Sequence, residues 1–444
     1  MNGPTETSAA VPVAKQAEST RTRWSWVEPA VWTERMLTAL EQGVKGGVWF
    51  SLMDKVFAVR NLEASFAKVR ANQGAAGIDH MTVEQFEAHQ IENLDWLSEA
   101  LRRGTYQPQA VRRVNIPKPD GTQRPLGIPT VRDRVVQGAL RQVLEPIFER
   151  DFAEHSYGFR PGRSCRDALR RVDQLLKSGH RYVVDADLKS YFDTIPHERL
   201  LERVRRRVAD GRVLHLLESY LHQGVFDGLD EWTPANGTPQ GAALSPLLAN
   251  VYLDPLDHLL AEQGFALVRY ADDFVILCRS PEEANRALAL VQQWVADNGL
   301  TLHPTKTRIV DVQQEGFDFL GYHFQTTKRG IDRWPRKKSL AKLKDNLRVK
   351  TKRANGHSLP CIIAAVNRTL RGWFGYFKYS RADTFPAVDG WVRMRLRSIL
   401  RKRRGGRGRG RGVDHQRWPN VYFAEQGLFS LQAAHRLACQ SPSG

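Results

Sequence analysis

The sequence of 444 residues predicts an α/β fold of the α+β type, followed by a helical and strongly basic region. Short apolar runs such as 182-YVVDAD-187 and 266-ALVRYADDFVILC-278 are typical of buried strands. The segments between these runs have the spacing of amphipathic helices, as in an α+β fold. The last third of the chain has a helical pattern and is rich in Lys and Arg, which predicts the basic region.

Composition limits the class of protein. With 41% hydrophobic and 26% charged residues, the chain is typical of a folded protein. No apolar run approaches the roughly 18 residues of a membrane span, and the N-terminus lacks the apolar core of a secretory signal. The four cysteines form no CxxC pair, so neither a zinc ribbon nor a disulfide framework is expected. These features predict a cytoplasmic protein that does not bind membranes.

Positive charge is concentrated in one region. Residues 328–412 contain 26 Lys and Arg against four acids, a net charge of +22, whereas the whole chain carries +18. The remainder therefore carries −4. Such a concentration is typical of a surface that binds a polyanion, and the alternative is a solvated basic face without a partner.

The elements of the first half follow from local signals. Residues 1–50 are expected to form a mobile N-terminal extension that ends in Trp-bearing amphipathic pieces. Helical spacing dominates residues 51–101. Residues 111–130 predict a hairpin, since apolar residues alternate on both sides of a Pro-Asp-Gly turn. A helix is expected over residues 131–149.

The second half alternates strands and helices before it becomes basic. Residues 181–201 predict a strand that turns into a helix, with Asp193 as its N-cap. A Gly/Pro-rich loop opens residues 236–256, and a helix is expected over residues 280–300. Short strands are expected near 306–312 and 317–324. The Gly/Arg repeat after them, 405-GGRGRGRG-412, predicts a low-complexity linker.

Aspartates follow strand-like runs at two places. By themselves, Asp272 and Asp273 are typical of a turn, where carboxylates accept backbone hydrogen bonds. A second pair, Asp185 and Asp187, follows Val183, and side chains two residues apart lie on one face of a strand. Strands that end in acids can converge at one edge of a sheet, where carboxylate oxygens suit Mg²⁺. This pattern predicts two Mg²⁺ ions about 3.5–4 Å apart for phosphoryl transfer.

Six blocks in fixed order carry a resemblance to a known family. They are RPLGIP, DADLKSYFD, TPQGAALSPLLANVYL, RYADDFVILC, GLTLHPTKT and FDFLGYHF. Their succession resembles that of reverse transcriptases, and the best match is the reverse transcriptase/maturase encoded by bacterial group II introns. The resemblance covers the chain from about Val56 onward. It implies a right-hand polymerase with fingers and an antiparallel-sheet palm, followed by a helical basic thumb/maturase domain.

The resemblance implies five parts. They are a mobile extension (1–50), an N-terminal helical region with the fingers (51–170), the palm with the catalytic aspartates (171–326), the thumb/maturase (X) domain (327–404) and a Gly/Arg linker with a small DNA-binding region (405–444). No HNH endonuclease is expected, because paired cysteines and a His/Asn cluster are lacking. The implied location is the bacterial cytosol or nucleoid.

The resemblance also assigns the catalytic acids. Asp187 matches the first metal ligand, on the first palm strand. Asp272 matches the better ligand of the YADD box and Asp273 its less direct partner. The three carboxylates are expected to hold two Mg²⁺ ions, for which Mn²⁺ can substitute.

Further matches predict nucleotide contacts. Lys118 and Arg124 match fingers residues that contact the incoming triphosphate, and without the palm they would be interpreted as an exposed cationic hairpin. Either Tyr191 or Phe192 is expected to place its ring against the nucleotide sugar and to exclude a 2′-hydroxyl. The spacing leaves this choice open, with Phe192 favoured.

The remaining palm matches lie near the templating base. Gln240 and Gly241 match the loop that packs under the templating base pair, where glycine allows close approach of the backbone. Lys306 matches a palm-associated lysine that protonates the pyrophosphate leaving group. The alternative for Lys306 is a surface lysine on a strand.

The basic region resembles the maturase or X domain, which grips structured RNA through its backbone and shape. Aromatic residues such as Trp373 and Phe377 are dense here, which favours helix packing over base stacking. In the helix after Trp391, an apolar seam alternates with basic residues. The residues expected to contact RNA are Arg371, Lys378, Arg393, Arg395, Arg397 and Arg401.

These features predict an RNA-directed DNA polymerase that also binds its intron RNA as a maturase and supports target-primed mobility. Its partners would be group II intron RNA, an RNA template with a DNA primer or target DNA, and dNTPs. The sequence leaves the oligomeric state open. One alternative is a domesticated or CRISPR-associated reverse transcriptase without an intron partner, and another is a non-catalytic RNA-binding splicing cofactor.

Overall fold

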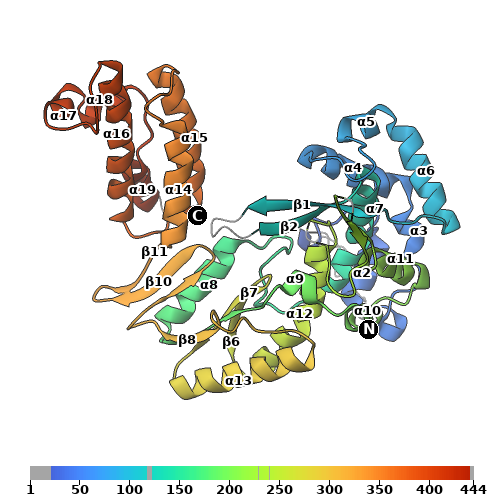
Figure 1. Cartoon of the computed structure of the whole chain (residues 1–444). Coiled ribbons are helices and arrows are strands. Elements are labelled where there is room, and N and C mark those ends of the chain that lie inside the picture. The colour runs from blue at the N-terminus through green and yellow to red at the C-terminus, as the bar shows by residue number, and fades with distance from the viewer. Residues whose placement is uncertain (1–21, 118–122, 229, 240, 441–444) are drawn as a thin grey trace, which may run out of the picture. The chain divides into compact units, whose positions relative to one another are not determined.

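The computed structural model describes residues 22–117, 123–228, 230–239 and 241–440, and for Lys45 and Arg124 it describes the backbone only. The chain divides into two compact units. Figure 1 shows its helices and strands, coloured by residue number. The first unit comprises Met1–Val172 and Val184–Arg308. The second comprises Asp173–Val183 and Ile309–Gly444.

The first unit begins with packed tryptophans. Trp24 and Trp32 are both buried, and the indole Nε1 of Trp32 donates to the carbonyl oxygen of Gln142 at 2.9 Å. The backbone NH of Trp49 donates to the carbonyl oxygen of Arg207 at 2.8 Å. The prediction of a mobile extension is therefore wrong for residues 22–50, because their aromatic side chains have partners far along the chain. Residues 1–21 lie outside the described residues.

Helices follow in the N-terminal part of this unit. Helices α4 and α7 cross closely, because a Cβ at Gly138 would lie 2.1 Å from Oγ of Ser65. The hydroxyl of Ser65 donates to the carbonyl oxygen of Val135 at 2.7 Å and fixes the crossing. The helices are α2 (Glu34–Gln42), α3 (Met53–Val56), α4 (Val59–Asn72), α5 (Val83–Ala88), α6 (Gln90–Arg103) and α7 (Val131–Glu149).

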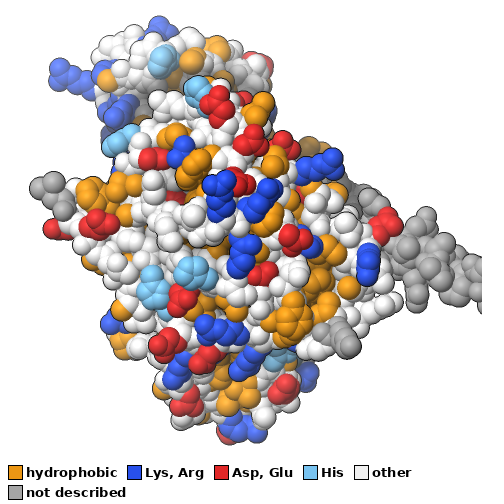
Figure 2. Space-filling view, turned by 90° about the vertical axis from the view of Figure 1, so that its right-hand side faces the viewer, with side chains coloured by type: hydrophobic (Ala, Val, Ile, Leu, Met, Phe, Trp, Pro, Cys, Tyr) orange, Lys and Arg blue, Asp and Glu red, His pale blue; other side chains and the backbone are white. Residues whose placement is uncertain are grey.

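Basic and acidic side chains are mixed on the face of the molecule in Figure 2, with no large patch of one sign. In Figure 1 this face is the right-hand side, where helices such as α5 and α6 lie. Mixed charge on this part of the first unit agrees with the small net charge of the chain outside residues 328–412.

The first sheet contains the predicted hairpin. Its strand order is β2-β1-β4-β5. Strands β1 and β2 pair antiparallel, which confirms the hairpin, and the turn at 118–122 lies outside the described residues. Strand β1 also pairs parallel with β4. The strands are β1 (Val111–Pro117), β2 (Gln123–Ile128), β4 (Val225–Asp227) and β5 (Asp230–Trp232).

The second sheet has the order β6-β7-β3-β8. Its apolar runs are fully buried, as Val183, Val184 and Val275 show, because β-branched residues pack well on a pleated surface. The strands are β3 (Tyr182–Asp187), β6 (Ala266–Tyr270), β7 (Asp273–Cys278) and β8 (Arg308–Asp311). The helices between them are α8 (Cys165–Lys177), α9 (Tyr191–Thr194), α10 (His197–Arg205), α11 (Gly211–Leu221), α12 (Ser245–Glu262) and α13 (Pro281–Asp297).

One predicted cap in this region is wrong. Asp193 lies inside helix α9 and does not precede it. The residue before the helix is Ser190, which has a left-handed backbone with φ of +50°. The helix starts earlier than the local pattern predicts because the ring of Tyr191 is drawn into the core, where it is 2% exposed.

The second unit joins a small antiparallel sheet to a helical bundle. Within the described residues of this unit, the core is formed mainly by α14, α15 and α16. Trp373 is partly buried and packs against this core, and Phe377 is buried with its ring centroid 4.9 Å from that of Trp373, so both take part in helix packing. The strands are β9 (Phe317–Phe319), β10 (Tyr322–Thr327) and β11 (Gly330–Pro335). The helices are α14 (Lys337–Lys350), α15 (Leu359–Phe377), α16 (Thr384–Arg403), α17 (Val413–Arg417), α18 (Asn420–Glu425) and α19 (Leu431–Gln440). Among all the described helices, none has the length and apolarity needed to cross a membrane.

The Gly/Arg segment 405–412 is held by defined contacts. Nε of Arg401 donates to the carbonyl oxygen of Arg407 at 2.8 Å, and Arg401 also pairs with Asp414. The backbone NH of Arg411 donates to Oδ2 of Asp414 at 3.0 Å. The segment, whose residues are all described, forms no helix or strand between α16 and α17, and two side chains outside it hold its backbone against α16.

Candidate active site

The turn between β6 and β7 presents two adjacent carboxylates. Tyr270 pairs with Asp273, so Ala271 and Asp272 form a two-residue turn. Ala271 has a φ of +60°, a region that favours glycine and that tight hairpins require. Residues 270–273 are named the aspartate turn below. Asp272 and Asp273 are both half-buried at this turn.

A buried arginine holds the aspartate turn. Arg269 is 0% exposed, and its Nη1 donates to the carbonyl oxygen of Ala271 at 3.0 Å. The same Nη1 donates to Oδ1 of Asn250 at 2.9 Å, and Nε donates to Oδ1 of Asp257 at 2.7 Å. Asn250 and Asp257 both lie on α12 and are themselves buried. A buried guanidinium with a carboxylate partner and further acceptors is fully compensated, so this network fixes the backbone of the turn.

A glycine completes this support. A Cβ at Gly158 would lie 2.3 Å from the backbone nitrogen of Ala271, so only glycine fits there. Nδ2 of Asn250 donates to the carbonyl oxygen of Gly158 at 2.8 Å. Arg269, Asn250 and Gly158 are not among the residues predicted from the sequence. The available signal was a charged residue inside an apolar strand run, which is costly to bury unless it has a structural partner.

The other predicted acid ends the neighbouring strand. Asp187 is the last residue of β3, and β3 is adjacent to β7 in the sheet. Its side chain is 38% exposed, and its Oδ2 accepts a hydrogen bond from Nζ of Lys306 at 2.8 Å. Its carbonyl oxygen accepts from the backbone NH of His303 at 2.7 Å. The sheet therefore places Asp187 and the aspartate turn on neighbouring strands, and Lys306 is an ion-pair partner of Asp187.

The carboxylates suit a divalent cation by their chemistry. Hard carboxylate oxygens are the ligands that Mg²⁺ prefers, and Mg²⁺ in such sites is usually completed by substrate phosphates. Within the described ranges, no group of three or more His, Cys, Asp or Glu side chains is close enough to hold a metal ion. The ammonium of Lys306 balances the charge of Asp187 in this arrangement. Support for a hard cation therefore comes from the oxygen chemistry of these carboxylates and not from a preformed ligand cluster in the described residues.

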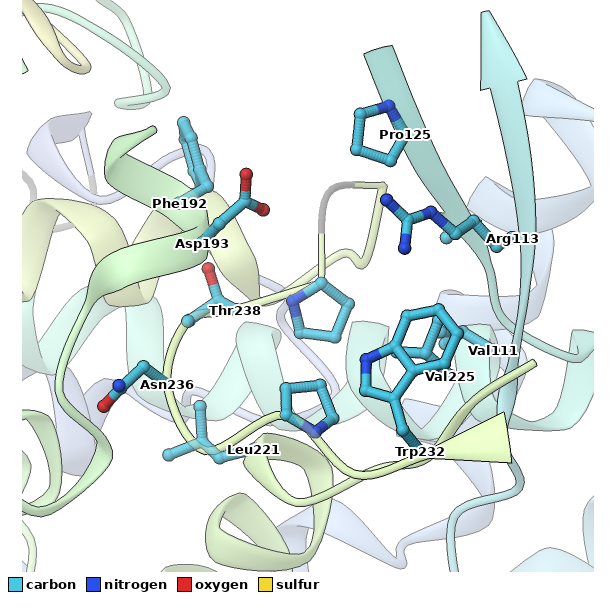
Figure 3. A pocket seen from close by; sticks show the side chains of 14 residues that line it. Val111, Arg113, Pro125, Phe192, Asp193, Leu221, Val225, Trp232, Asn236 and Thr238 are labelled. Atoms are coloured by element: carbon cyan, nitrogen blue, oxygen red, sulfur yellow. The ribbon is translucent and has the colours of Figure 1, made fainter. Parts of the chain in front are cut away.

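The two aromatic candidates for the sugar contact differ in position. Tyr191 is buried, its hydroxyl donates to the carbonyl oxygen of Ala249 at 2.6 Å, and burial raises its pKa well above the ordinary value. Phe192 is half-buried and lines a cavity of about 350 Å³ together with Asp193 and Arg113 (Figure 3). Of the two candidates, Phe192 lines this cavity and Tyr191 does not.

The loop before α12 approaches the hairpin closely. Gly241 has a φ of +109°, and a Cβ there would lie 2.6 Å from the carbonyl oxygen of Gly127 in β2. This contact requires glycine at position 241. Gln240 and Lys118 lie outside the described residues, and the backbone of Arg124 pairs with Ile116 in the hairpin.

Five of the six residues expected to contact RNA are exposed or half-buried, and Arg395 and Arg401 are among the half-buried ones. Arg371 is exposed, Lys378 and Arg393 are half-buried, and all three lie in the second unit. Arg401 pairs with Asp414, as described above.

Arg397 must be removed from the predicted RNA contacts. It is 4% exposed, its Nε donates to the carbonyl oxygen of Trp418 at 2.9 Å, and its Nη2 donates to Oδ1 of Asn420 at 2.8 Å. The guanidinium holds α18 against α16 and is not available to phosphate. Sequence periodicity missed this role because its acceptors lie more than twenty residues downstream.

Comparison with known proteins identifies both parts of the chain. Residues 116–324 match the family described as reverse transcriptase (RNA-dependent DNA polymerase). Residues 340–418 match the group II intron maturase-specific domain. The chain belongs to the group II intron reverse transcriptase/maturase family. Its first matched domain is an RNA-directed DNA polymerase, so the protein is an enzyme of the nucleotidyltransferase class.

Two curated relatives illustrate the extent of the similarity. The reverse transcriptase is 37% identical over 286 aligned positions to protein YkfC of Escherichia coli K12, covering 55% of this chain and 74% of that protein. It is 37% identical over 201 positions to the group II intron-encoded protein LtrA of Lactococcus lactis, covering 45% of this chain but only 33% of LtrA. The chain therefore spans about a third of LtrA.

Among solved structures, a partial Cas6-RT-Cas1–Cas2 complex is similar with a TM-score of 0.37 and 26% identity, covering 56% of this chain and 41% of that chain. This similarity is too low to support a CRISPR-associated function for the reverse transcriptase. The maturase-specific match favours the group II intron family over the CRISPR-associated enzyme, and the reverse transcriptase match over residues 116–324 favours a polymerase over the non-catalytic splicing cofactor.

Proposed function

We propose that this chain copies RNA into DNA, and that it also binds group II intron RNA to assist splicing and mobility by target-primed reverse transcription. One observation carries the proposal. Asp187 and the aspartate turn lie on neighbouring strands of one sheet, in a chain whose residues 340–418 match a maturase-specific domain. Its partners would be group II intron RNA, an RNA template with a DNA primer or target DNA, and dNTPs.

Asp187, Asp272 and Asp273 are the proposed ligands of two Mg²⁺ ions, together with the phosphates of the nucleotide. When bound, such ions activate the primer 3′-oxygen and neutralise charge on the leaving phosphates. The chain itself positions the carboxylates, since the Arg269 network fixes the aspartate turn. Lys306, which lies 2.8 Å from Asp187, is the proposed proton donor to the pyrophosphate leaving group.

The proposed nucleotide contacts come from the hairpin, from the residues after β3 and from the loop before α12. Lys118 and Arg124 would neutralise the triphosphate, whose charge the ions balance only in part. The ring of Phe192 would lie against the sugar and exclude a 2′-hydroxyl. Gln240 and Gly241 would pack under the templating base pair, and the close contact of Gly241 with β2 supports this placement.

RNA binding is proposed for the basic second unit. Its phosphate contacts would be made mainly by exposed or half-buried cations, because such contacts give affinity without reading bases. The residues proposed for this role are Arg371, Lys378, Arg393, Arg395 and Arg401.

Primer extension tests the polymerase proposal. The full chain should extend a DNA primer on an RNA template in Mg²⁺ with dNTPs and far less with rNTPs. The double variant Asp272→Ala/Asp273→Ala should lose at least about 10³-fold in extension rate, since metal ligands support several kcal/mol of transition-state stabilisation. The control Asp95→Ala removes an exposed carboxylate from α6 and should extend normally.

A splicing assay separates the second activity. Intron RNA affinity and splicing assistance should survive the double variant, because they would depend on the basic surface. Absence of extension by the wild-type chain would refute the polymerase proposal. Equal loss of splicing in a double variant that melts like wild type would refute the proposed division of labour.

A further inference from the structure

Four arginines line a small cavity in the second unit. Its volume is about 110 Å³, and it lies between α14, α16 and the Gly/Arg segment. The lining residues, all in the described part of the chain, are Arg348, Thr351, Arg353, Trp391, Met394, Arg395, Ser398 and Arg409. Four of these eight are arginines and none is acidic. We name this site the arginine cavity.

Arg395 is fixed in the wall of the cavity before any ligand arrives. Its Nε donates to Oγ1 of Thr351 at 3.0 Å, and its Nη2 donates to the carbonyl oxygen of Thr351 at 2.9 Å. Nη2 also donates to the carbonyl oxygen of Arg348 at 3.3 Å. These bonds use Nε and Nη2 and leave Nη1 for a ligand. A guanidinium held in this way loses little side-chain entropy on binding an anion.

Trp391 forms an aromatic wall beside the same cations. The guanidinium carbons of Arg395 and Arg348 lie 5.7 Å and 5.8 Å from its ring centroid, and Nζ of Lys344 lies 6.0 Å from it. Cation–π contacts at these distances orient the side chains but do not neutralise their charge.

The Gly/Arg segment places Arg409 at the cavity. The backbone of this segment is held by Arg401 and Asp414, through the hydrogen bonds described above. A Cβ at Gly410 would lie 3.0 Å from Cβ of Arg397, so glycine allows the segment to lie against α16. The repeat that resembles a flexible linker therefore delivers a guanidinium to a defined place.

The charges of the arginine cavity are not balanced within the protein. Burial lowers the pKa of Arg395, and the neighbouring Arg348 and Arg353 lower it further. Within the described residues, the side chains of Arg353 and Arg409 make no hydrogen bond or ion pair with the protein. Arg348 has one carboxylate partner, Asp345. Like charges around one small cavity repel each other unless an anion enters.

We propose that the arginine cavity binds one phosphodiester group of the RNA backbone. This inference rests on the proposed RNA-binding function and gives it a specific site. The cavity is far smaller than the roughly 300 Å³ of small-molecule pockets, so it admits a phosphate but not a nucleotide. All eight lining residues fall within 340–418, the maturase-specific match, which favours RNA over duplex DNA.

The test compares two double variants of the full chain. Arg353→Gln/Arg409→Gln removes two cavity guanidiniums that have no protein partner, so folding should be unaffected. Arg404→Gln/Arg407→Gln removes the same charge from neighbouring exposed positions that do not line the cavity. The probe is a fluorescein-labelled group II intron transcript, titrated by anisotropy at several salt concentrations, with duplex DNA and inorganic phosphate as separate arms.

The cavity variant should bind the transcript roughly tenfold or more weakly than the control variant, because it loses charge-assisted hydrogen bonds. Its plot of log affinity against log salt should also be shallower by about one per lost phosphate contact. Duplex DNA binding should change equally in both variants. Primer extension on a short RNA template should stay near wild type, which distinguishes failure of this inference from failure of the polymerase proposal.

Three results would overturn the inference. The first is equal transcript affinity in the cavity and control variants. The second is a selective loss of duplex DNA binding by the cavity variant, which would make the site a DNA contact. The third is stabilisation of the wild type alone by inorganic phosphate without any difference in transcript affinity, which would make the site a free-anion pocket.

Discussion

Replacing Arg269 with Met tests whether a buried ion pair holds the aspartate turn. Methionine fills much of the same space but removes the charge and every donor. The variant leaves Asp257 buried without its partner and removes the 3.0 Å hydrogen bond to the carbonyl oxygen of Ala271. Arg269→Met should therefore affect stability and catalysis through two separable contacts.

The two effects have different sizes. Breaking a buried ion pair by removing one partner costs about 3–5 kcal/mol of stability. If the turn relaxes by about 1 Å, the extension rate should fall roughly 10²-fold even in the folded fraction. The double variant Arg269→Met/Asp257→Leu removes both charges and should recover most of the stability, since apolar replacements of a buried pair are often neutral. It cannot restore the bond to Ala271, so its extension rate should stay low.

Thermal melting and single-turnover extension below the melting range measure both quantities. Glu149→Leu is a matched control, because it breaks the ion pair with Arg160, whose Nη2 lies 2.8 Å from Oε1 of Glu149 and which makes no hydrogen bond to the aspartate turn. It should lower stability and leave the rate of the folded enzyme unchanged. A wild-type extension rate in Arg269→Met/Asp257→Leu would show that Arg269 does not position the turn.

Two further predictions concern other parts of the first unit. Burial raises the pKa of Asp133 to about 6 from 3.8, against opposing hydrogen bonds from Thr130 and Tyr106. The folded state therefore holds this proton more tightly than the unfolded chain, and about 3 kcal/mol of stability, complete below pH 3.8, is lost as the pH rises through 6. Thermal melts of Asp133→Asn should lack this part of the pH dependence, and an unchanged profile would contradict the assignment. Gly241→Ala should lower stability and the extension rate more than the control Gly330→Ala. Both glycines have φ near +110°, but only at position 241 does an atom lie within 4 Å of the added Cβ. Equal losses in the two variants would show that backbone strain alone accounts for the effect.

Local signals predicted the elements whose limits are set by nearby residues. Helix α7 spans Val131–Glu149 as expected, because Thr130 caps it from the adjacent position. The hairpin of β1 and β2 was also predicted, since alternation and turn residues lie within one short stretch. The succession of blocks placed Asp187 and the aspartate turn on one sheet before any geometry was known.

The errors share a physical cause, which is contact between residues far apart in the chain. The indole of Trp32 donates to an acceptor 110 residues later in the chain. The composition of the N-terminus cannot predict a contact over that distance. Arg397 has the helical position of a surface cation but is buried by Trp418 and by Asn420 and Phe423 of α18. Arg269 depends on α12, whose contribution becomes visible only when strand and helix are placed together.

Helix α12 contacts both the loop that precedes it and, through Arg269, the aspartate turn. At its start, Oγ of Ser245 donates to the carbonyl oxygen of Pro239, beside the loop proposed to lie under the templating base pair. One and three turns further on, Asn250 and Asp257 hold Arg269 and through it the aspartate turn. Helix α12, of 18 residues and about 27 Å in length, therefore connects the two. If the loop lies under the templating base pair as proposed, a misshapen base pair that displaced it would also shift the residues that hold the aspartate turn, which would couple copying accuracy to catalytic geometry.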